Sequence, residues 1–321
     1  MNESRKKRIL KRIVCTLACL AVLAAVCYSA VGIYVYNASV HAVNQERRAL
    51  QCKKDALEKR GFDVDAFETQ YHKQVVEIPS SFGDYEIPAN YLSPDGSWTG
   101  KTVILAHGLN GNRLTGYPVA AMFLKHGYHV LTYDQRASGE NEAEYMTCGY
   151  WESRDFADCV TYVRSRAGED QQIGAWGSSI GGATIGFYLG TGEAQKQLSF
   201  AILDCPVSNM AEIIDCFLTR KADWIPAKLR LSAGSAITKL RLGYDYADGD
   251  VCDNIAGTSV PVLIFHTKQD RVTPYHMGSD LYQAMQNNRK KKISVEDSGH
   301  TDIYLDHPKF YEQEMFEFIE Q

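Results

Sequence analysis

The residues with the clearest capacity for chemistry form the segment Gly177-Ser178-Ser179-Ile180-Gly181. This is a G-x-S-x-G pattern, preceded by an apolar run at 173–176 and followed by a helix-compatible segment at 182–189. A serine in a strained turn between a strand and a helix exposes its hydroxyl and leaves no room for side chains two residues away. The pattern predicts Ser179 as a nucleophile. A Gly/Ser-rich turn without chemistry is the alternative, because a chain of this length contains the pattern by chance about one time in ten.

A serine hydroxyl needs a base to accept its proton, and the base needs an anion to hold its tautomer. Of the nine histidines, His300 stands in a glycine-containing turn beyond the last predicted strand and is the candidate base. Asp270 follows the predicted strand 262–266 and precedes His300, which is the order expected after a strand–turn–helix nucleophile. Asp204 is the rival acid. A surface histidine and a helix-capping or turn aspartate are the non-catalytic alternatives.

Acyl transfer also requires two backbone donors for the developing oxyanion. The N–H of Ile180, directly after the nucleophile, is the first candidate. The second is the N–H of Leu109, in the loop after the predicted strand 102–106, where Gly108 lets the backbone approach a ligand closely. We expect His107 to brace this loop rather than to carry out acid–base chemistry.

The surrounding elements should hold these residues at one edge of a sheet. Apolar strands alternate with amphipathic helices, which is typical of a mostly parallel sheet covered on both faces, with the site at the carboxyl ends of the strands. The predicted strands are 73–78 and 85–92, as an antiparallel hairpin, then 102–106, 129–133, 173–176, 200–203, 262–266 and 291–295. The predicted helices are 117–125, 152–166, 182–189, 274–287 and 308–320.

One long insertion interrupts this alternation, at about residues 206–257 before the penultimate strand. It is rich in helix formers (210–219, 225–231 and 236–242), and so long a connection predicts a helical cap. Among its apolar residues, Trp224, Phe217 and Leu218 are candidates for substrate contact, with ordinary core packing as the alternative.

The N-terminus predicts a single membrane-spanning helix. Residues 1–12 carry six basic groups, and residues 13–36 are apolar and longer than the roughly 20 residues that span a bilayer. A signal anchor is favoured over a cleaved signal peptide, whose apolar region is about 7–15 residues. The basic tail should stay cytoplasmic, which places the rest of the chain outside the cell membrane. Residues 37–70 are interpreted as a stalk or helical linker, and residues 71–321 as the main domain.

The amino-acid composition limits the classes of molecule that the protein is expected to bind. Residues 1–36 hold six of the 34 basic and one of the 39 acidic residues, so the remainder carries 28 basic and 38 acidic residues, a net charge of −10. An acidic domain without a basic stripe argues against nucleic acid. Outside the anchor, six cysteines (Cys52, Cys148, Cys159, Cys205, Cys216 and Cys252) show no zinc-type spacing, and their pairing is left open. Neither a metal nor a cofactor is expected.

Over roughly residues 73–321 the chain resembles the α/β-hydrolase superfamily, and within it the bacterial membrane-anchored, serine-aminopeptidase/lysophospholipase-like branch. The resemblance rests on His107-Gly108, Tyr133 to Gly139, Gly177 to Gly181, Asp270 with Val272-Thr273-Pro274, and Gly299-His300. It implies Ser179, Asp270 and His300 as a triad and the residues after Leu203 as a cap. Arg136 is expected to be structural. Leu109 departs from the glycine-rich oxyanion loop of some esterases, which argues against bulky tertiary-alcohol esters.

The sequence thus predicts a cofactor-independent serine hydrolase, with a small-molecule carboxylic ester as the first expected substrate and a thioester or amide next. A peptidase is the alternative within the enzymes, although the cap shows no acidic cluster for a peptide terminus. A catalytically idle, membrane-tethered binding protein on the same scaffold is the alternative from another class. The oligomeric state is left open.

Overall fold

The protein is described by a computed structural model that covers residues 3–94, 99–167 and 171–321. Two compact units can be distinguished. Residues 1–39 and 214–248 form the first, which we call the helical unit. Residues 40–213 and 249–321 form the second, which we call the sheet unit. Each unit is described separately below.

The sheet unit contains an eight-stranded sheet with the order β1-β2-β4-β3-β5-β6-β7-β8. Strand β2 is antiparallel to both of its neighbours, whereas the other pairs are parallel. The strands are β1 His72–Pro79, β2 Glu86–Ser93, β3 Lys101–Ala106, β4 His129–Tyr133, β5 Gln172–Ser178, β6 Phe200–Asp204, β7 Val262–Thr267 and β8 Lys290–Val295. The predicted hairpin followed by a parallel sheet is confirmed.

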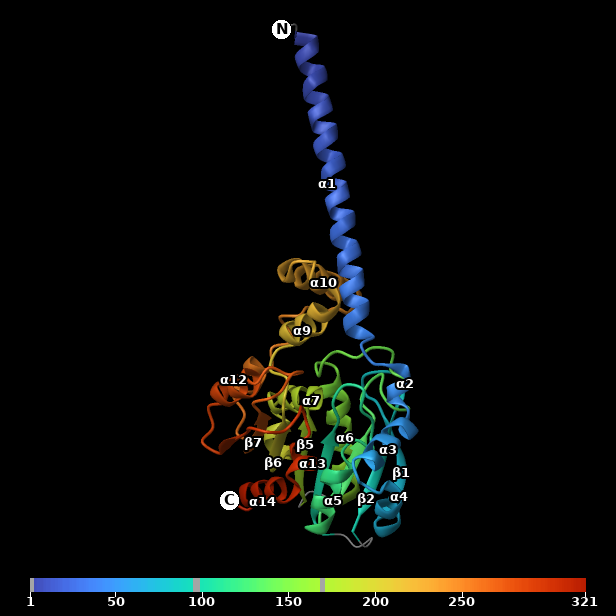
Figure 1. Cartoon of the computed structure of the whole chain (residues 1–321), viewed down its shortest axis with the longest axis vertical. Helices are drawn as coiled ribbons and strands as arrows, with labels where there is room; N and C mark the ends of the chain where they lie inside the picture. The colour runs from blue at the N-terminus through green and yellow to red at the C-terminus, as the bar shows by residue number, and fades with distance from the viewer. Residues whose placement is uncertain (1–2, 95–98, 168–170) are drawn as a thin grey trace. The chain divides into compact units, whose positions relative to one another are not determined.

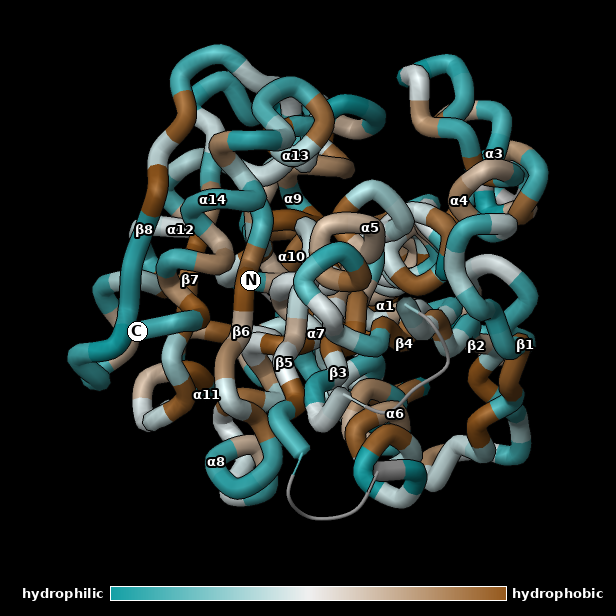
Figure 2. The backbone as a smooth tube through the Cα atoms, turned by 90° about the horizontal axis from the view of Figure 1, so that it is seen from below, coloured by the Kyte–Doolittle hydropathy of each residue, from teal (hydrophilic) through white to brown (hydrophobic). Residues whose placement is uncertain are grey.

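Burial explains why the central strands were recognisable. Every residue of β4, β6 and β7 is buried, as expected for parallel strands covered on both faces. Figure 2 shows these strands as hydrophobic segments in the middle of the unit. The carboxyl ends of β5, β6 and β7 lie side by side, because Ser178 pairs with Asp204, and Asp204 pairs with Phe265.

Helices cover both faces of the sheet (Figures 1 and 2). On one face, α6, α7, α11 and α12 pack against one another, and on the other, α5, α13 and α14 do so. Their bounds are α5 Tyr117–Lys125, α6 Glu152–Ala167, α7 Ile180–Leu189, α8 Ala194–Gln197, α11 Val251–Ile255, α12 His276–Ala284, α13 Ile303–Asp306 and α14 Pro308–Ile319. Together with the sheet they form the predicted α/β-hydrolase fold.

The segment interpreted as a stalk, residues 37–70, is largely part of the sheet unit. It forms α2 Gln45–Arg48, α3 Leu50–Lys59 and α4 Val64–Gln70. Leu57, Val64 and Phe67 are buried in the core, and the Phe67 ring lies 4.6 Å from that of Tyr117. The stalk interpretation needs this correction because a few apolar residues in an otherwise polar segment are enough to dock two short helices.

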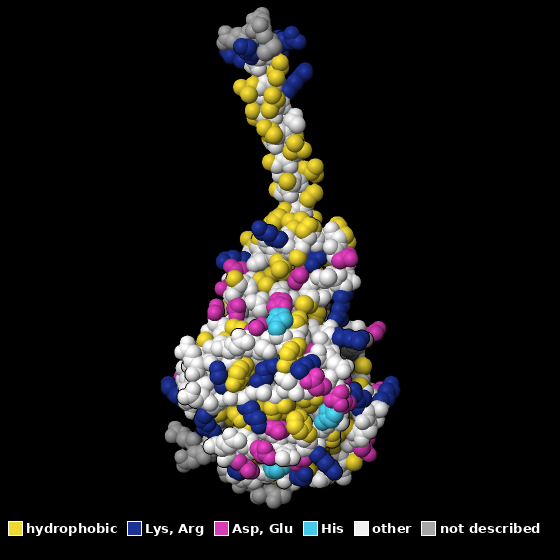
Figure 3. Space-filling view, turned by 60° about the vertical axis from the view of Figure 1, so that its left-hand side comes forward, with side chains coloured by type: hydrophobic (Ala, Val, Ile, Leu, Met, Phe, Trp, Pro, Cys, Tyr) yellow, Lys and Arg dark blue, Asp and Glu magenta, His cyan; other side chains and the backbone are white. Residues whose placement is uncertain are grey.

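The helical unit contains all but the last residue of α1 Glu3–Val40, most of α9 Met210–Ala222, and α10 Ala227–Leu242. Helix α1 is long and apolar enough to span a membrane. Figure 3 shows hydrophobic side chains along it and basic ones at its beginning. The cap was predicted at 206–257, but only residues 214–248 belong to this unit, because α11 packs on α7 in the sheet unit.

Helix α10 also differs from the prediction of two helices, 225–231 and 236–242. It is continuous through the small residues 232–236. Those small residues form a packing surface, because the structure buries Ala233 and Gly234 in the middle of the helix.

Candidate active site

Ser179 lies in the sharp turn between β5 and α7. Its backbone has φ 55° and ψ −117°, a conformation that non-glycine residues rarely adopt. Its N–H donates to the carbonyl oxygen of Asp204 at 2.8 Å, which ties the turn to the end of β6. A Cβ atom at Gly181 would lie 2.1 Å from the carbonyl oxygen of Ala106, so only glycine fits there. Strain at a serine that the neighbouring strands hold in place is typical of a functional site.

His300 and Asp270 converge on this serine in the folded chain. In the sequence, His300 lies 121 residues after Ser179 and 30 residues after Asp270. The Nε2 atom of His300 lies 3.0 Å from Ser179 Oγ, and its Nδ1 lies 2.6 Å from Asp270 Oδ2. A carboxylate only accepts, so Nδ1 carries the proton and Nε2 is free to accept the serine proton. This arrangement can activate a serine for nucleophilic attack.

The loops that carry the two partners are tied together at the ends of β7 and β8. Thr267 Oγ1 donates to the carbonyl oxygen of Ser298 at 2.7 Å. The N–H of Lys268 donates to the carbonyl oxygen of Val295 at 2.8 Å. These bonds hold the histidine loop beside the aspartate turn, so that the imidazole is positioned before a substrate arrives.

The side chain of Asp270 is completely buried and is held by several hydrogen bonds. Its Oδ1 accepts from the backbone N–H groups of Val272 and Thr273, each at 2.8 Å. Burial by itself raises the pKa of Asp270, but hydrogen bonds from His266 and His300 outweigh it and hold this pKa well below the usual range. The carboxylate therefore stays ionised beside the imidazole, as an anion that orients a catalytic base must.

His266 is a partner of Asp270 that the sequence reasoning did not assign. It is fully buried, and its Nε2 lies 3.4 Å from Asp270 Oδ2 and 3.2 Å from the carbonyl oxygen of Thr273. Both neighbours are acceptors, so Nε2 carries the proton. The sequence feature that could have identified His266 is its position at the end of a predicted strand, four residues before the candidate acid.

Asp204, the rival acid, faces a different network. Its Oδ2 accepts from the hydroxyl of Tyr311 at 2.9 Å, and that hydroxyl accepts from Trp176 Nε1 at 2.8 Å. Burial raises the pKa of Asp204 to about 6, against the opposing effect of the Tyr311 bond. The geometry therefore favours Asp270 as the partner of His300.

The two residues predicted to hold the oxyanion lie around one small pocket. Leu109 and Ile180 line it together with Gly108 and Gln135. A Cβ atom at Gly108 would lie 3.1 Å from Ser179 Cβ, which shows how closely this loop approaches the nucleophile. The arrangement is compatible with the two backbone donors that acyl transfer requires.

His107 braces that loop. Its Nδ1 donates to the carbonyl oxygen of Gly108 at 2.7 Å, and its Nε2 accepts from the N–H of Gln135 at 3.1 Å. Burial lowers the pKa of His107 to about 4, so the ring is neutral and can play both roles. Gln135 returns a bond to the carbonyl of His107 and accepts from Thr184 on α7 at 2.8 Å. Gln135 thus links the oxyanion loop to the helix that begins after the nucleophile.

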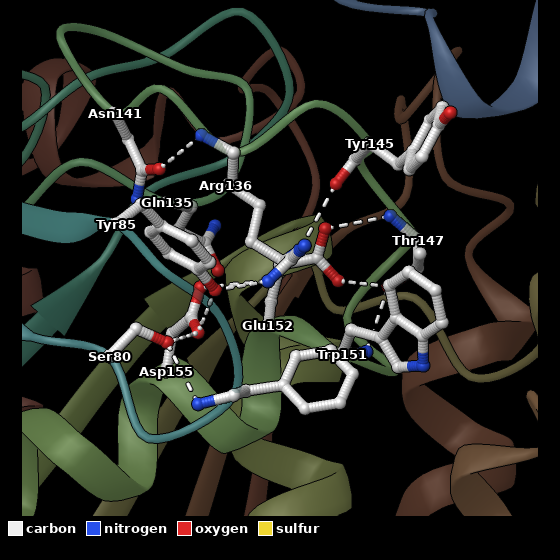
Figure 4. Close-up of polar contacts among 12 residues, drawn as sticks. Ser80, Tyr85, Gln135, Arg136, Asn141, Tyr145, Thr147, Trp151, Glu152 and Asp155 are labelled. Atoms are coloured by element: carbon white, nitrogen blue, oxygen red, sulfur yellow. Dashed lines mark hydrogen bonds and ion pairs between the residues drawn. The ribbon is translucent and has the colours of Figure 1, made fainter. Parts of the chain in front are cut away.

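Arg136 is enclosed by aromatic rings and anions (Figure 4). Its guanidinium lies 5.2–5.4 Å from the ring centres of Phe82, Tyr85 and Trp151. It also lies 3.6 Å from Asp155 and donates to the carbonyl oxygen of Tyr145. So many fixed contacts favour the structural role expected for this arginine, as a support under the loop that follows β4.

The three cap residues predicted to contact substrate belong to the helical unit, and they differ in exposure. Trp224 is 79% exposed, Phe217 is half-buried, and Leu218 is only 3% exposed. Leu218 therefore packs within its unit, and Trp224 presents its ring to solvent. Their contact with a substrate stays a prediction.

One group of potential metal ligands occurs among the described residues: atoms of Cys205, Asp270 and His300 lie within 4.8 Å of one another. Two of these residues are already hydrogen-bonded to each other. Burial raises the pKa of the Cys205 thiol well above its ordinary value, which disfavours the thiolate that a metal would require. The group is better described as a hydrogen-bonded aspartate and histidine with a neighbouring thiol.

Comparison with known proteins agrees with this geometry. A family model described as alpha/beta hydrolase fold matches residues 101–225. The uncharacterized protein YqkD of Bacillus subtilis strain 168 is 28% identical over 261 residues, which is 81% of this chain and 83% of YqkD. The thiohydrolase aneE of Aspergillus aculeatus is 34% identical over 116 residues, or 35% of this chain and 36% of aneE.

Among solved structures, the esterase Pf2001 of Pyrococcus furiosus matches with a TM-score of 0.63 at 20% identity, covering 78% of this chain and 92% of the esterase. Identity this low establishes the fold alone. The fold, the family match and the strand–turn–helix serine agree with one another. The chain therefore has the α/β-hydrolase fold, and its residues 101–225 match the family model of that fold.

Proposed function

We propose that the protein is a serine hydrolase that cleaves carboxylic esters through an acyl-enzyme. The observation that carries the proposal is the convergence of Ser179, His300 and Asp270, at 3.0 and 2.6 Å, on a strained nucleophile turn. The match to the alpha/beta hydrolase family model and the esterase among the fold neighbours support a hydrolase. The choice of an ester rests on the sequence argument and on this geometry.

Each residue has a defined role in the proposed reaction. Ser179 Oγ attacks the carbonyl carbon while His300 Nε2 takes its proton, and the backbone N–H groups of Ile180 and Leu109 stabilise the oxyanion. His300 then protonates the departing alcohol, and an acyl-enzyme remains on Ser179. Water, deprotonated by His300, releases the acid and restores the serine. Asp270 holds the imidazole tautomer throughout.

Hydrolysis of nitrophenyl acetate and butyrate by the full chain tests this proposal. Replacement of the nucleophile, Ser179→Ala, should lower kcat/KM by about 10⁴-fold or more. The neighbouring Ser178 is equally buried and provides a matched control, because Ser178→Ala leaves the nucleophile in place. Turnover by Ser179→Ala at the wild-type rate would exclude the mechanism and would favour an idle binding protein on this scaffold.

A thioester substrate is the second candidate. The observation that favours it is the 34% identity to the thiohydrolase aneE over 116 residues, although that match covers about a third of either chain. Comparing kcat/KM for an ester, a thioester and an aminoacyl arylamide with the same acyl group ranks the leaving groups. Fastest turnover of the arylamide would replace the ester proposal by a peptidase.

We further propose that α1 anchors the protein in the cell membrane, with the catalytic part outside the cytoplasm. Its apolar window has a mean hydropathy of 2.3 and is not covered by other parts of the protein, unlike the core helix of a globular domain. Basic residues precede the window and would stay on the cytoplasmic side. Retention in the membrane pellet after alkaline carbonate, with residue 1 still present, supports an anchor. Release of a shortened chain would identify a cleaved signal sequence.

A further inference from the structure

Within the helical unit, the last turns of α1 pack tightly against α10. A Cβ atom at Gly32 would lie 2.6 Å from the carbonyl oxygen of Ala233 and 2.6 Å from a side-chain atom of Ile237. A Cβ atom at Gly234 would lie 2.3 Å from Val35. Small residues that bring two helices this close are typical of packing between helices in or near membranes. The contact is visible in Figure 1, where α10 lies beside the end of α1.

Polar and aromatic contacts continue this packing beyond Gly32. The Arg241 guanidinium lies 5.4 Å from the centre of the Tyr36 ring. The Ser39 and Tyr246 hydroxyls are 3.2 Å apart, and Tyr246 also accepts from Thr238 at 3.5 Å. Because these contacts hold α10 against the end of α1, the position of α1 in a bilayer would fix how far α10 lies from the hydrocarbon core.

That depth follows from helix length. About 20 residues cross the roughly 30 Å hydrocarbon core of a bilayer. Counted from Ile13, the first residue after the basic tail, these residues end near Gly32. The contacts with α10 and with Tyr246, which follows it, begin at this point and extend to Ser39. Since helix rise is about 1.5 Å per residue, they span about 10 Å, which is enough to cross the headgroup layer of about 5–8 Å on that side.

The exposed surface of α9 and α10 has the composition that this layer favours. Trp224 is 79% exposed and Leu240 81% exposed, and Leu229 is also exposed. Between residues 218 and 242 the sequence holds six basic residues and one acidic one, in a protein whose residues after 36 carry a net charge of −10. Lys221 and Lys228 are also exposed, and they lie three residues before Trp224 and one residue before Leu229 in the sequence. Tryptophan and basic residues gather at membrane interfaces, and basic groups favour anionic headgroups.

We propose that this surface, defined by Trp224, Leu229, Leu240, Lys221 and Lys228, rests in the headgroup layer of the leaflet from which α1 emerges, and that it binds anionic lipid. We call it the interfacial surface. The proposal rests on the anchoring proposed above and does not depend on the hydrolase chemistry. It assigns the cap a second role, as a part of the protein that contacts lipid directly.

Quenching of tryptophan fluorescence by lipid tests the proposal. The full chain is reconstituted into vesicles of phosphatidylcholine and phosphatidylglycerol, 7:3, in which the phosphatidylcholine carries bromine near the headgroup. Wild-type emission should be quenched, and Trp224→Phe should reduce the quenched fraction at least twofold. The matched control, Trp151→Phe in the sheet unit, should not reduce it. Equal quenching in wild type and Trp224→Phe would overturn the proposal.

Charge reversal gives the second measurement. Lys221→Glu/Lys228→Glu should lower the quenching about twofold in vesicles with phosphatidylglycerol, and less in phosphatidylcholine alone. The control pair Lys196→Glu/Lys309→Glu reverses two exposed lysines of the sheet unit and should leave quenching unchanged. Equal loss with both pairs would contradict a specific basic surface.

Flotation of the vesicles separates the possible failures. A chain that does not float with the vesicles overturns the anchor and this inference together. A chain that floats, but shows no quenching of Trp224, overturns the inference alone. A dimer in detergent in which Trp224 is shielded would assign the surface to a second copy of the chain, which also contradicts a lipid contact. Ester hydrolysis is measured in a separate assay, and its result does not change the interpretation of flotation or quenching.

Discussion

Two aspartates at neighbouring strand ends, Asp204 at the end of β6 and Asp270 after β7, both have buried side chains but behave in opposite ways. Asp270 accepts from two backbone N–H groups and faces the rings of His266 and His300. Asp204 accepts from the hydroxyl of Tyr311. The pKa of Asp270 is held well below its usual range, whereas burial raises that of Asp204 to about 6.

The difference shows that partners, rather than burial, decide what a carboxyl group at this edge can do. Burial disfavours the charged form in both sites. Hydrogen bonds from two imidazoles and from backbone N–H groups reverse that effect at Asp270. At Asp204 the hydrogen bonds from Tyr311 and Cys205 do not outweigh burial. An anion that fixes a histidine tautomer must remain charged, so only the first site suits a triad. Four substitutions separate the two sites experimentally.

The largest expected effect is on turnover. Asp270→Asn removes the anion and lets the amide favour the wrong tautomer of His300, so kcat should fall by about 10⁴-fold. The matched control is Asp204→Asn, which should keep kcat within about tenfold of wild type because it lies outside the triad. Initial rates on a nitrophenyl ester measure both. Comparable losses in the two variants would remove the distinction between the sites.

The next effect concerns stability and pH at Asp204. Its pKa rises from 3.8 to about 6 on folding, so the folded chain binds this proton more tightly than the unfolded chain. The ionised carboxylate of Asp204 therefore destabilises the folded protein above pH 6, and this destabilisation disappears as the pH falls towards 4 and the carboxylate is protonated. Between pH 7 and pH 4, the free energy of unfolding of wild type should rise relative to that of Asp204→Asn by up to about 3 kcal/mol. Urea titrations of both proteins would show this, and parallel pH profiles would contradict it.

A somewhat smaller effect is expected from the phenol that faces Asp204. Tyr311→Phe leaves both the Asp204 carboxyl and the Trp176 indole N–H without a buried partner, so stability should fall by about 1–3 kcal/mol. Turnover should change little. Tyr304 lies beside Tyr311, with ring centres 5.9 Å apart, and Tyr304→Phe is the control because its hydroxyl takes no part in this chain of bonds. Thermal unfolding of the two variants measures this difference in stability. A loss of turnover in Tyr311→Phe alone would contradict the account, because it would show that this network takes part in the reaction.

The smallest effect is expected at the second imidazole beside Asp270. His266→Gln weakens the positioning of the triad acid, so kcat should fall about tenfold while KM stays close to wild type. The exposed His276 on α12 offers the matched control, His276→Gln. A rise in KM with unchanged kcat would argue that His266 does not act through Asp270.

Much of this fold was predictable from the sequence, because its strands are apolar on both faces and its helices are amphipathic. The bounds of β4 and α5 agree with the prediction residue for residue. The catalytic candidates were also identifiable, since the strained serine turn depends on neighbouring glycines, and the order of acid and base along the chain follows from the topology.

Other features depended on tertiary contacts that no local pattern reveals. The segment 37–70 resembled a polar linker until Leu57, Val64 and Phe67 were seen in the core. The small residues in the middle of α10 lie between the helix-forming stretches named from the sequence, and their contact with α1 is set by the tertiary structure. The role of His266 depends on a 3.4 Å approach to Asp270, which is set by the fold of the turn between them.

The central claim is that one activated serine carries the chemistry, and covalent labelling tests it most directly. A fluorophosphonate probe should add its mass once to the full chain, on the peptide that contains Ser179, and should fail to label Ser179→Ala. Labelling should slow markedly in Asp270→Asn and remain near the wild-type rate in Asp204→Asn. Labelling at another residue, or equal labelling of wild type and Ser179→Ala, would contradict the account.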